Sequence, residues 1–233
     1  MVKKIAYKKI RKGYWKKAIA VGATALLAGG GYWLIQGKDG SKFPVPSYQV
    51  LRVVDGDTFE TTNRQLIRLT GIDAPEIDNC GGKEAKEELE KLVMGKNIYL
   101  KVIFRDKSNR LISHVYNEKG LVAQQLVEKG SVFYTGDGID SDELKNLANI
   151  KKENKVGIFG DCVETENKKN PTCNIKGNYR KETGEKLYRF PGCGQYHSTL
   201  VQTYLGDRWF CSEEEAVEAG YHKGSDCFDR KAK

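Results

Sequence analysis

The chain has 233 residues, of which 39% are hydrophobic and 30% are charged. This balance is ordinary for a globular protein and argues against a disordered or fibrous chain. The net charge of +8 (39 basic minus 31 acidic residues) equals the number of Lys and Arg residues within positions 1–17, a segment without acidic residues. The remainder is formally neutral, so the basic composition alone is no evidence for a nucleic-acid surface.

An uncharged run over residues 18–35 follows the basic start. A membrane-spanning helix needs ~20 apolar residues, whereas the apolar part of a signal peptide has ~7–15. We therefore expect a transmembrane helix within residues 1–36, with the N-terminus in the cytoplasm and the chain after about residue 37 outside. A cleaved signal peptide followed by secretion is the alternative. The six cysteines, an even number in a chain that we expect to be exported, favour disulfides.

Residues 37–47 form a polar linker with Gly and Pro, and short periodic segments follow it. Alternating apolar residues and turn signals predict five strands, and apolar stripes at helical spacing predict three helices. The strands are expected at 48–54, 58–62, 65–70, 97–104 and 111–116, and the helices at 83–94, 121–129 and from Asp140 or Ser141 to about 155. This order is compatible with an OB-type five-stranded barrel carrying helices over residues 48–162.

The composition changes after Cys162. Residues 163–171 are a polar linker, and residues 172–228 form a loop-rich segment with four cysteines. We call residues 172–228 the C-terminal module and expect a small cysteine-rich α+β fold. A unit of that size usually needs covalent or metal staples.

Acidic and basic residues suited to phosphodiester hydrolysis recur along the predicted barrel. In chain order they lie in Asp55-Gly56-Asp57-Thr58, at Arg68, in Ile72-Asp73-Ala74-Pro75-Glu76 and in Asp106-Lys107-Ser108-Asn109-Arg110. Hydrolysis of a phosphodiester needs cations that stabilise charge on the phosphorus oxygens and a carboxylate that orients or deprotonates water. A hard divalent ion needs oxygen ligands. Two Asp, one Glu and two Arg meet these needs.

These motifs, together with Gly82-Lys83-Glu84-Ala85, resemble the signature of the staphylococcal-nuclease (thermonuclease) family in order and spacing over roughly residues 48–161. The resemblance implies an OB-fold nuclease that uses Ca²⁺ to cut DNA and RNA. It also implies in-line attack at phosphorus and a product with a 3′-phosphate end.

The resemblance assigns a role to each matching residue. The carboxylates of Asp57 and Asp73 and the backbone carbonyl of Ala74 would bind Ca²⁺. Glu76 would position or deprotonate the attacking water. Arg68 and Arg110 would clamp the phosphate and stabilise the transition state.

The chain departs from the family pattern just before the second arginine. Ser108 and Asn109 stand where the family often has an aromatic residue and Gly, whereas Lys107 matches a phosphate-contacting lysine. Tyr134 lies near a sequence position at which the family has another substrate-binding residue, a tyrosine. Residues 47–161 hold 17 basic and 19 acidic residues, so we expect weak long-range attraction of a polyanion.

The resemblance to exported relatives implies a disulfide between Cys80 and Cys162. The remaining cysteines, which are Cys173, Cys193, Cys211 and Cys227, resemble those of a small module often appended to such nucleases. Two disulfides are expected there. A zinc site is the alternative, because the segment also resembles the zinc module of DNA-repair methyl-transfer proteins. That resemblance would need a closing Cys-x-x-Cys, and Gly224 stands where its first cysteine should be.

Each candidate residue also has a structural interpretation. The two acids around Gly56 suit a turn, and Asp73 suits a helix cap. Arg68 could form a buried ion pair with Glu60 or Asp73, and Arg110 could be a solvated turn residue.

Two other functions compete with the nuclease, namely a non-catalytic nucleic-acid-binding OB module and an envelope protein that only holds DNA. We expect a monomer. The sequence indicates no protein partner.

Overall fold

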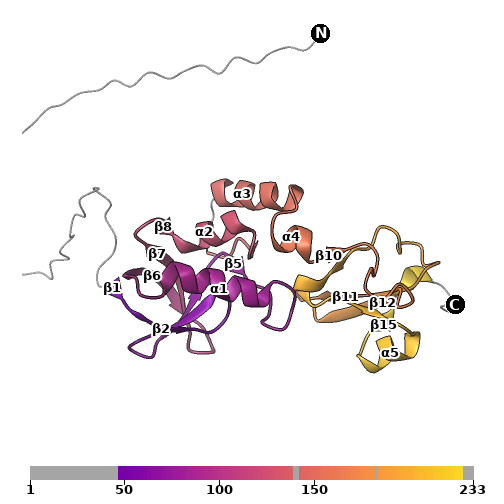
Figure 1. Cartoon of the computed structure of the whole chain (residues 1–233). Helices are drawn as coiled ribbons and strands as arrows, with labels where there is room; N and C mark the ends of the chain where they lie inside the picture. Colours follow the sequence, from indigo (N-terminus) through magenta and orange to yellow (C-terminus); the bar gives the residue numbers. More distant parts are fainter. Residues whose placement is uncertain (1–46, 139–141, 182, 228–233) are drawn as a thin grey trace, which may run out of the picture. The chain divides into compact units, whose positions relative to one another are not determined.

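The computed structural model describes residues 47–138, 142–181 and 183–227 (Figure 1). The predicted transmembrane segment and the predicted helix caps Asp140 and Ser141 lie outside these ranges. Within them, no helix is long and apolar enough to cross a membrane.

One curved sheet forms the barrel, and its strand order is β1-β6-β7-β4-β3-β2, with β8 paired to β7. The bounds are β1 Ser47–Tyr48, β2 Val50–Val53, β3 Thr58–Thr61, β4 Leu66–Leu69, β6 Ile98–Arg105, β7 Leu111–Asn117 and β8 Gly120–Leu121. The five predicted strands correspond to β2, β3, β4, β6 and β7. The predicted number is nevertheless too low, because the first predicted strand divides at Gln49 and β8 adds a short edge.

The division at Gln49 brings the two ends of the sheet together. β1 pairs with β6 at one end of the strand order, and β2 pairs with β3 at the other. Only Gln49 separates β1 from β2 along the chain, so the sheet must curve until its edges are adjacent. This is the near-closed barrel that the sequence predicted.

Three helices lie where the sequence predicts them, namely α1 Gly82–Val93, α2 Val122–Lys129 and α3 Asp142–Glu153. Gly95 and Gly130 follow the first two with left-handed backbone (φ 68° and 67°), which lets each chain direction change without side-chain strain. A fourth helix, α4 Ile158–Asp161, was not predicted because one turn is too short to show a helical period.

The inner face of the barrel and the apolar faces of α1 and α2 share one hydrophobic core. Its members include Phe59, Ile67, Leu89, Ile98, Val115 and Leu126. This packing fixes β3 and β4, and it therefore fixes the polar residues at their ends. A separate two-stranded pair, β5 Ile72–Asp73 with β9 Phe133–Tyr134, lies beside the barrel.

The C-terminal module has its own sheet, with strand order β14-β11-β12-β15. The bounds are β11 Ile175–Arg180, β12 Glu185–Arg189, β14 Arg208–Phe210 and β15 His222–Lys223, with helix α5 Glu213–Glu218 and the 3₁₀ turns η1 Thr203–Leu205 and η2 Ser225–Cys227. Buried residues that include Ile175, Phe190, Phe210 and Tyr221 form its core. The expected α+β module is thus present, while the exact domain limits stay a prediction.

The module and the barrel are connected through a small apolar cluster and a strand pair. Tyr204 of η1 packs on Phe159 of α4 and on Phe133 of β9, with ring centroids 5.8 Å and 6.0 Å apart. β10 Val163–Glu164 pairs with β13 Val201–Gln202.

The six cysteines form three pairs at disulfide distance, and none is free. Cys80 pairs with Cys162, as the resemblance implies, and it joins the start of α1 to the end of α4. In the module the pairs are Cys173–Cys211 and Cys193–Cys227. The pairing favours the two expected disulfides over the zinc alternative.

Candidate functional site

The predicted site residues lie at the ends of neighbouring strands. Asp57 sits in the turn between β2 and β3, and Arg68 lies on β4, where it is in register with Thr58. Asp73 is on β5, and Glu76 follows in the next loop. The turn before Asp57 needs Gly56, because a Cβ there would lie 2.6 Å from the Ala85 Cβ.

Asp57 is an almost fully buried carboxylate, with 5% of its surface exposed. Its Oδ2 accepts a hydrogen bond from the Ala74 backbone N–H at 2.7 Å, and its Oδ1 accepts one from the Thr58 hydroxyl at 2.9 Å. Burial raises the pKa of Asp57 to about 7, and the charge of Arg68 opposes this rise. The site therefore contains a carboxylate whose negative charge is only partly compensated by the protein.

Arg68 joins the two predicted metal-binding acids. Its Nη1 lies 2.9 Å from Asp57 Oδ2, and its Nη2 lies 2.6 Å from Asp73 Oδ1. The Arg68 Nη1 also donates to the backbone carbonyls of Leu69 and Ile72. The structural interpretation of Arg68 is thus right for Asp73 and wrong for Glu60, which pairs with Arg52 and Arg64 instead. Asp73 lies on a strand and is not a helix cap.

A cavity of about 750 Å³ collects the predicted chemistry in one place. The predicted residues that line it are Asp57, Arg68, Asp73, Ala74, Glu76 and Arg110. Glu76 extends into solvent, with 75% of its side chain exposed. Arg110 is 36% exposed, and its Nε donates to Asp106 Oδ2 at 2.8 Å, which orients the guanidinium beside the cavity.

Two predicted substrate residues lie elsewhere. Lys107 is exposed in the turn between β6 and β7, outside the residues that line this cavity. Tyr134 on β9 lines an adjoining cavity of about 890 Å³. Tyr134 shares that adjoining cavity with Asp73, because β9 pairs with β5, whereas Lys107 lines neither cavity.

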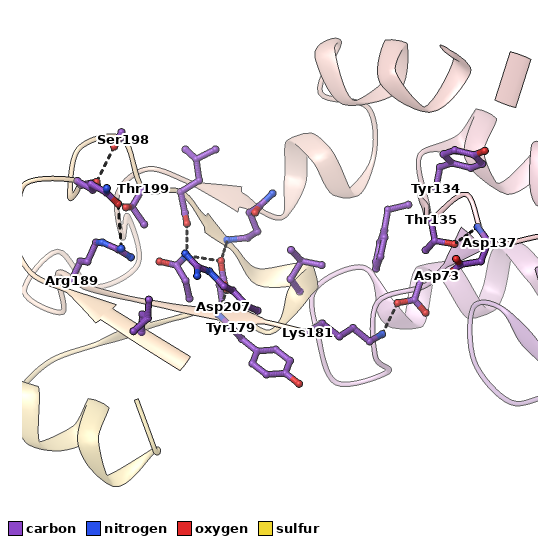
Figure 2. Close-up of a pocket in the computed structure, with 18 residues that line it drawn as sticks. Asp73, Tyr134, Thr135, Asp137, Tyr179, Lys181, Arg189, Ser198, Thr199 and Asp207 are labelled. Carbon is purple, nitrogen blue, oxygen red and sulfur yellow. Dashed lines mark hydrogen bonds and ion pairs between the residues drawn. The ribbon is translucent and has the colours of Figure 1, made fainter. Parts of the chain in front are cut away.

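Lys181 of the C-terminal module is a site residue that sequence reasoning missed. Its Nζ lies 2.5 Å from Asp73 Oδ2 and 3.7 Å from Glu76 Oε1, and Figure 2 shows its side chain directed at Asp73. Partial burial lowers the pKa of Lys181, but the hydrogen bond and charge of Asp73 outweigh it and raise the pKa overall. No local motif marks this lysine, since the contact depends on how the module packs.

Asp55 and Phe104 also line the cavity without having been predicted as site residues. The Asp55 carboxylate accepts a hydrogen bond from the Asp57 backbone N–H at 3.1 Å and so supports the turn. In the described part of the chain, no group of three or more His, Cys, Asp or Glu side chains is arranged to hold a metal ion.

Comparison with known proteins agrees with this geometry. The family model described as "Staphylococcal nuclease homologue" matches residues 66–161. A protein of Escherichia coli O157:H7 named "Uncharacterized endonuclease" is 30% identical over 118 residues, which cover 49% of this chain and 77% of that protein. A rice protein named "Probable staphylococcal-like nuclease CAN1" is 38% identical over 95 residues, which cover 40% of this chain and 28% of that protein.

The match to the family model begins at β4 and ends at α4, so it contains Arg68, Asp73, Glu76 and Arg110. The alignment with the bacterial relative spans most of that protein. The chain therefore belongs to the family of staphylococcal nuclease homologues.

Proposed function

We propose that this nuclease hydrolyses phosphodiester bonds of DNA and RNA with the help of Ca²⁺, and that it acts outside the cytoplasm. The observation that carries the proposal is the convergence of Asp57, Asp73, Glu76, Arg68 and Arg110 on one cavity. A module that binds nucleic acid without catalysis has no need for an exposed carboxylate, that of Glu76, in the same cavity as two arginines and two further acids.

The residues present fit a hard divalent cation. Asp57, Asp73 and Ala74 line the same cavity, so the two carboxylates and the backbone carbonyl of Ala74 would hold the ion. Oxygen ligands of this kind are those that Ca²⁺ takes, with water or substrate completing the coordination. The raised pKa of the buried Asp57 supports this fit, because a bound cation would stabilise its charged form.

When bound, the ion would supply charge stabilisation to the phosphoryl oxygens. The side chains do the rest. Glu76 is exposed and reaches the cavity, so it can hold a water molecule by hydrogen bonding and accept its proton. Arg110 can donate two parallel hydrogen bonds to phosphate oxygens, as guanidinium groups do. Arg68 can share its donors between substrate and the acids that now hold it.

Action outside the cytoplasm is supported by the three cysteine pairs, because disulfides persist in oxidising compartments. The way in which the chain reaches the outside, as a membrane-anchored or a secreted protein, stays a prediction from the basic and apolar N-terminal sequence. The expected monomer also stays a prediction.

The test is cleavage of a labelled single-stranded DNA in Ca²⁺ by the wild type and by Glu76→Gln. We expect the substitution to lower the rate by roughly 10²–10⁴-fold, the usual contribution of a positioned acid–base group. Asp78→Asn is the matched control, since Asp78 is an exposed carboxylate two residues further along. Equal rates in wild type and Glu76→Gln would contradict the assigned role. DNA binding without cleavage in every variant would favour the non-catalytic OB module.

A further inference from the structure

Phe104 is the aromatic residue among the described residues that line the carboxylate cavity. It is 55% exposed, although it lies on strand β6 and not on a loop. Its neighbours Val102 and Ile103 are also exposed, at 46% and 42%, but neither of them lines the cavity. The feature that requires an explanation is the position of Phe104 relative to Arg68.

Strand pairing places Phe104 in a row with Arg68. Phe104 on β6 is in register with Ile112 on β7, and Ile112 is in register with Arg68 on β4. Residues in register on neighbouring strands project from the same face of a sheet. All three residues line the cavity, as this row requires. Neighbouring strands lie about 4.8 Å apart, so the ring is about 10 Å from the arginine position along the row.

A bulge in β6 produces this placement. Val102 pairs with Ser113 and Phe104 pairs with Ile112, so Ile103 is an extra residue on β6. A bulge of this kind changes which side chains of a strand face a given side, and bulges often occur next to active sites. In a regular register, Ile103 would lie opposite Ile112 and Phe104 opposite Leu111, so the ring would face the other side of the sheet.

The row thus has the guanidinium of Arg68 at one end and a flat apolar ring at the other. A nucleotide has the complementary arrangement, with an anionic phosphate and a planar base. Aromatic side chains stack on bases of any sequence, because every base has a flat π-face. The turn residues 107–109 between β6 and β7 include no aromatic residue that could do this.

We propose that Phe104 is a substrate-binding residue whose ring stacks on a nucleobase adjacent to the phosphate held by Arg68 and Arg110. The proposal rests on the proposed nuclease function and adds how the substrate is held. It also explains why a chain with a weak basic field can retain a polynucleotide at the site, since stacking does not depend on charge.

The experiment measures binding separately from cleavage. The full-length Glu76→Gln protein in Ca²⁺ binds a 5′-fluorescein single-stranded DNA, and fluorescence anisotropy gives Kd. We expect Phe104→Ala to raise Kd by about 5- to 150-fold, as loss of a base–aromatic stack does. Phe104→Tyr should stay near the parent value. Val102→Ala is the matched control, because Val102 is 46% exposed on the same strand and does not line the cavity.

A base-free strand separates stacking from a general effect on the site. With an abasic deoxyribose-phosphate oligomer, the parent and Phe104→Ala should have equal Kd values. The proposal is overturned if Phe104→Ala binds the ordinary DNA as tightly as the parent, or if it weakens both strands equally. A parent protein that binds no DNA, beside a wild type that cuts none, would instead overturn the nuclease function together with this inference.

Discussion

The guanidinium of Arg68 lies 2.6 Å from the carboxylate of Asp73, and the same group lies 2.9 Å from Asp57. The side chains of Arg68 and Asp73 are each 16% exposed, so little water screens the contact. The two acids that we propose as Ca²⁺ ligands are thus bridged by the positively charged side chain of Arg68. Bound substrate and bound metal would each change how this guanidinium is shared.

Replacing Arg68 should leave two neighbouring acids without compensation. We expect Arg68→Ala to lower the free energy of unfolding in chelator by about 3 kcal/mol, the scale for breaking a largely buried ion pair. Ca²⁺ should restore part of the loss by binding the acids. Urea denaturation with and without Ca²⁺ measures both effects. Arg64→Ala, which breaks an exposed pair with Glu60, should cost less than about 1 kcal/mol. Equal losses in the two variants would contradict this account.

Asp57 should make the metal-free protein less stable as pH rises. Its pKa is about 7 in the folded chain, against an ordinary value of 3.8 for an unfolded chain, so the folded chain binds more protons between these values. Stability from this group is therefore present below about pH 4 and is lost as pH rises towards 7. In chelator, Asp57→Asn should unfold at a higher temperature than wild type at about pH 8, but not at about pH 4. A variant less stable than wild type at the higher pH would show that the charge of Asp57 is well compensated.

Lys181 should compete with a divalent cation for Asp73. Its Nζ contacts the second oxygen of that carboxylate, so an ion that binds there must displace an ammonium group. We expect Lys181→Ala to lower the half-saturating Ca²⁺ concentration by roughly 2- to 5-fold, the scale of a partly exposed ion pair. Calorimetric Ca²⁺ titration measures this, with Lys169→Ala, an exposed linker lysine, as control. Weaker Ca²⁺ binding in Lys181→Ala would mean that the lysine supports the cation site.

The Cys80–Cys162 pair should stabilise the barrel against unfolding. It closes a loop with a sequence separation of 82 residues and joins α1 to α4. Replacing both cysteines by serine should cost on the order of 2–5 kcal/mol in the free energy of unfolding. Chemical denaturation measures the loss, and non-reducing peptide mapping checks the pairing. Peptides that link Cys80 to a cysteine of the C-terminal module would contradict the pairing.

The local hydrophobic pattern of the sequence was sufficient to predict most strands and helices of the barrel. The alternation around Ile98 and Leu100 and the apolar stripe through Ala85 and Leu89 are properties of single elements, so sequence could locate them. The acids and arginines could be recognised because their motifs resemble the family signature in order and spacing along the chain. The break at Gln49 could not be predicted, because it follows from which partner strand each half meets.

The missed site residues depend on tertiary structure. Phe104 faces the cavity because of a bulge, and a register shift leaves no local signal in the sequence. Lys181 comes from another module, 108 residues after the acid that it contacts. The substrate roles of Lys107 and Tyr134 stay predictions. Lys107 does not line the cavity of the carboxylates, and Tyr134 lines the adjoining cavity together with Asp73.

The most direct test of the central claim is the Ca²⁺ requirement of cleavage. Purified full-length protein is incubated with a fluorophore-quenched single-stranded DNA, first in Ca²⁺ and then in excess chelator, beside Arg110→Ala. The account predicts rapid cleavage in Ca²⁺, loss of cleavage in chelator that added Ca²⁺ reverses, and a large loss in Arg110→Ala. Cleavage that continues unchanged in chelator, or its absence in Ca²⁺, would contradict the account.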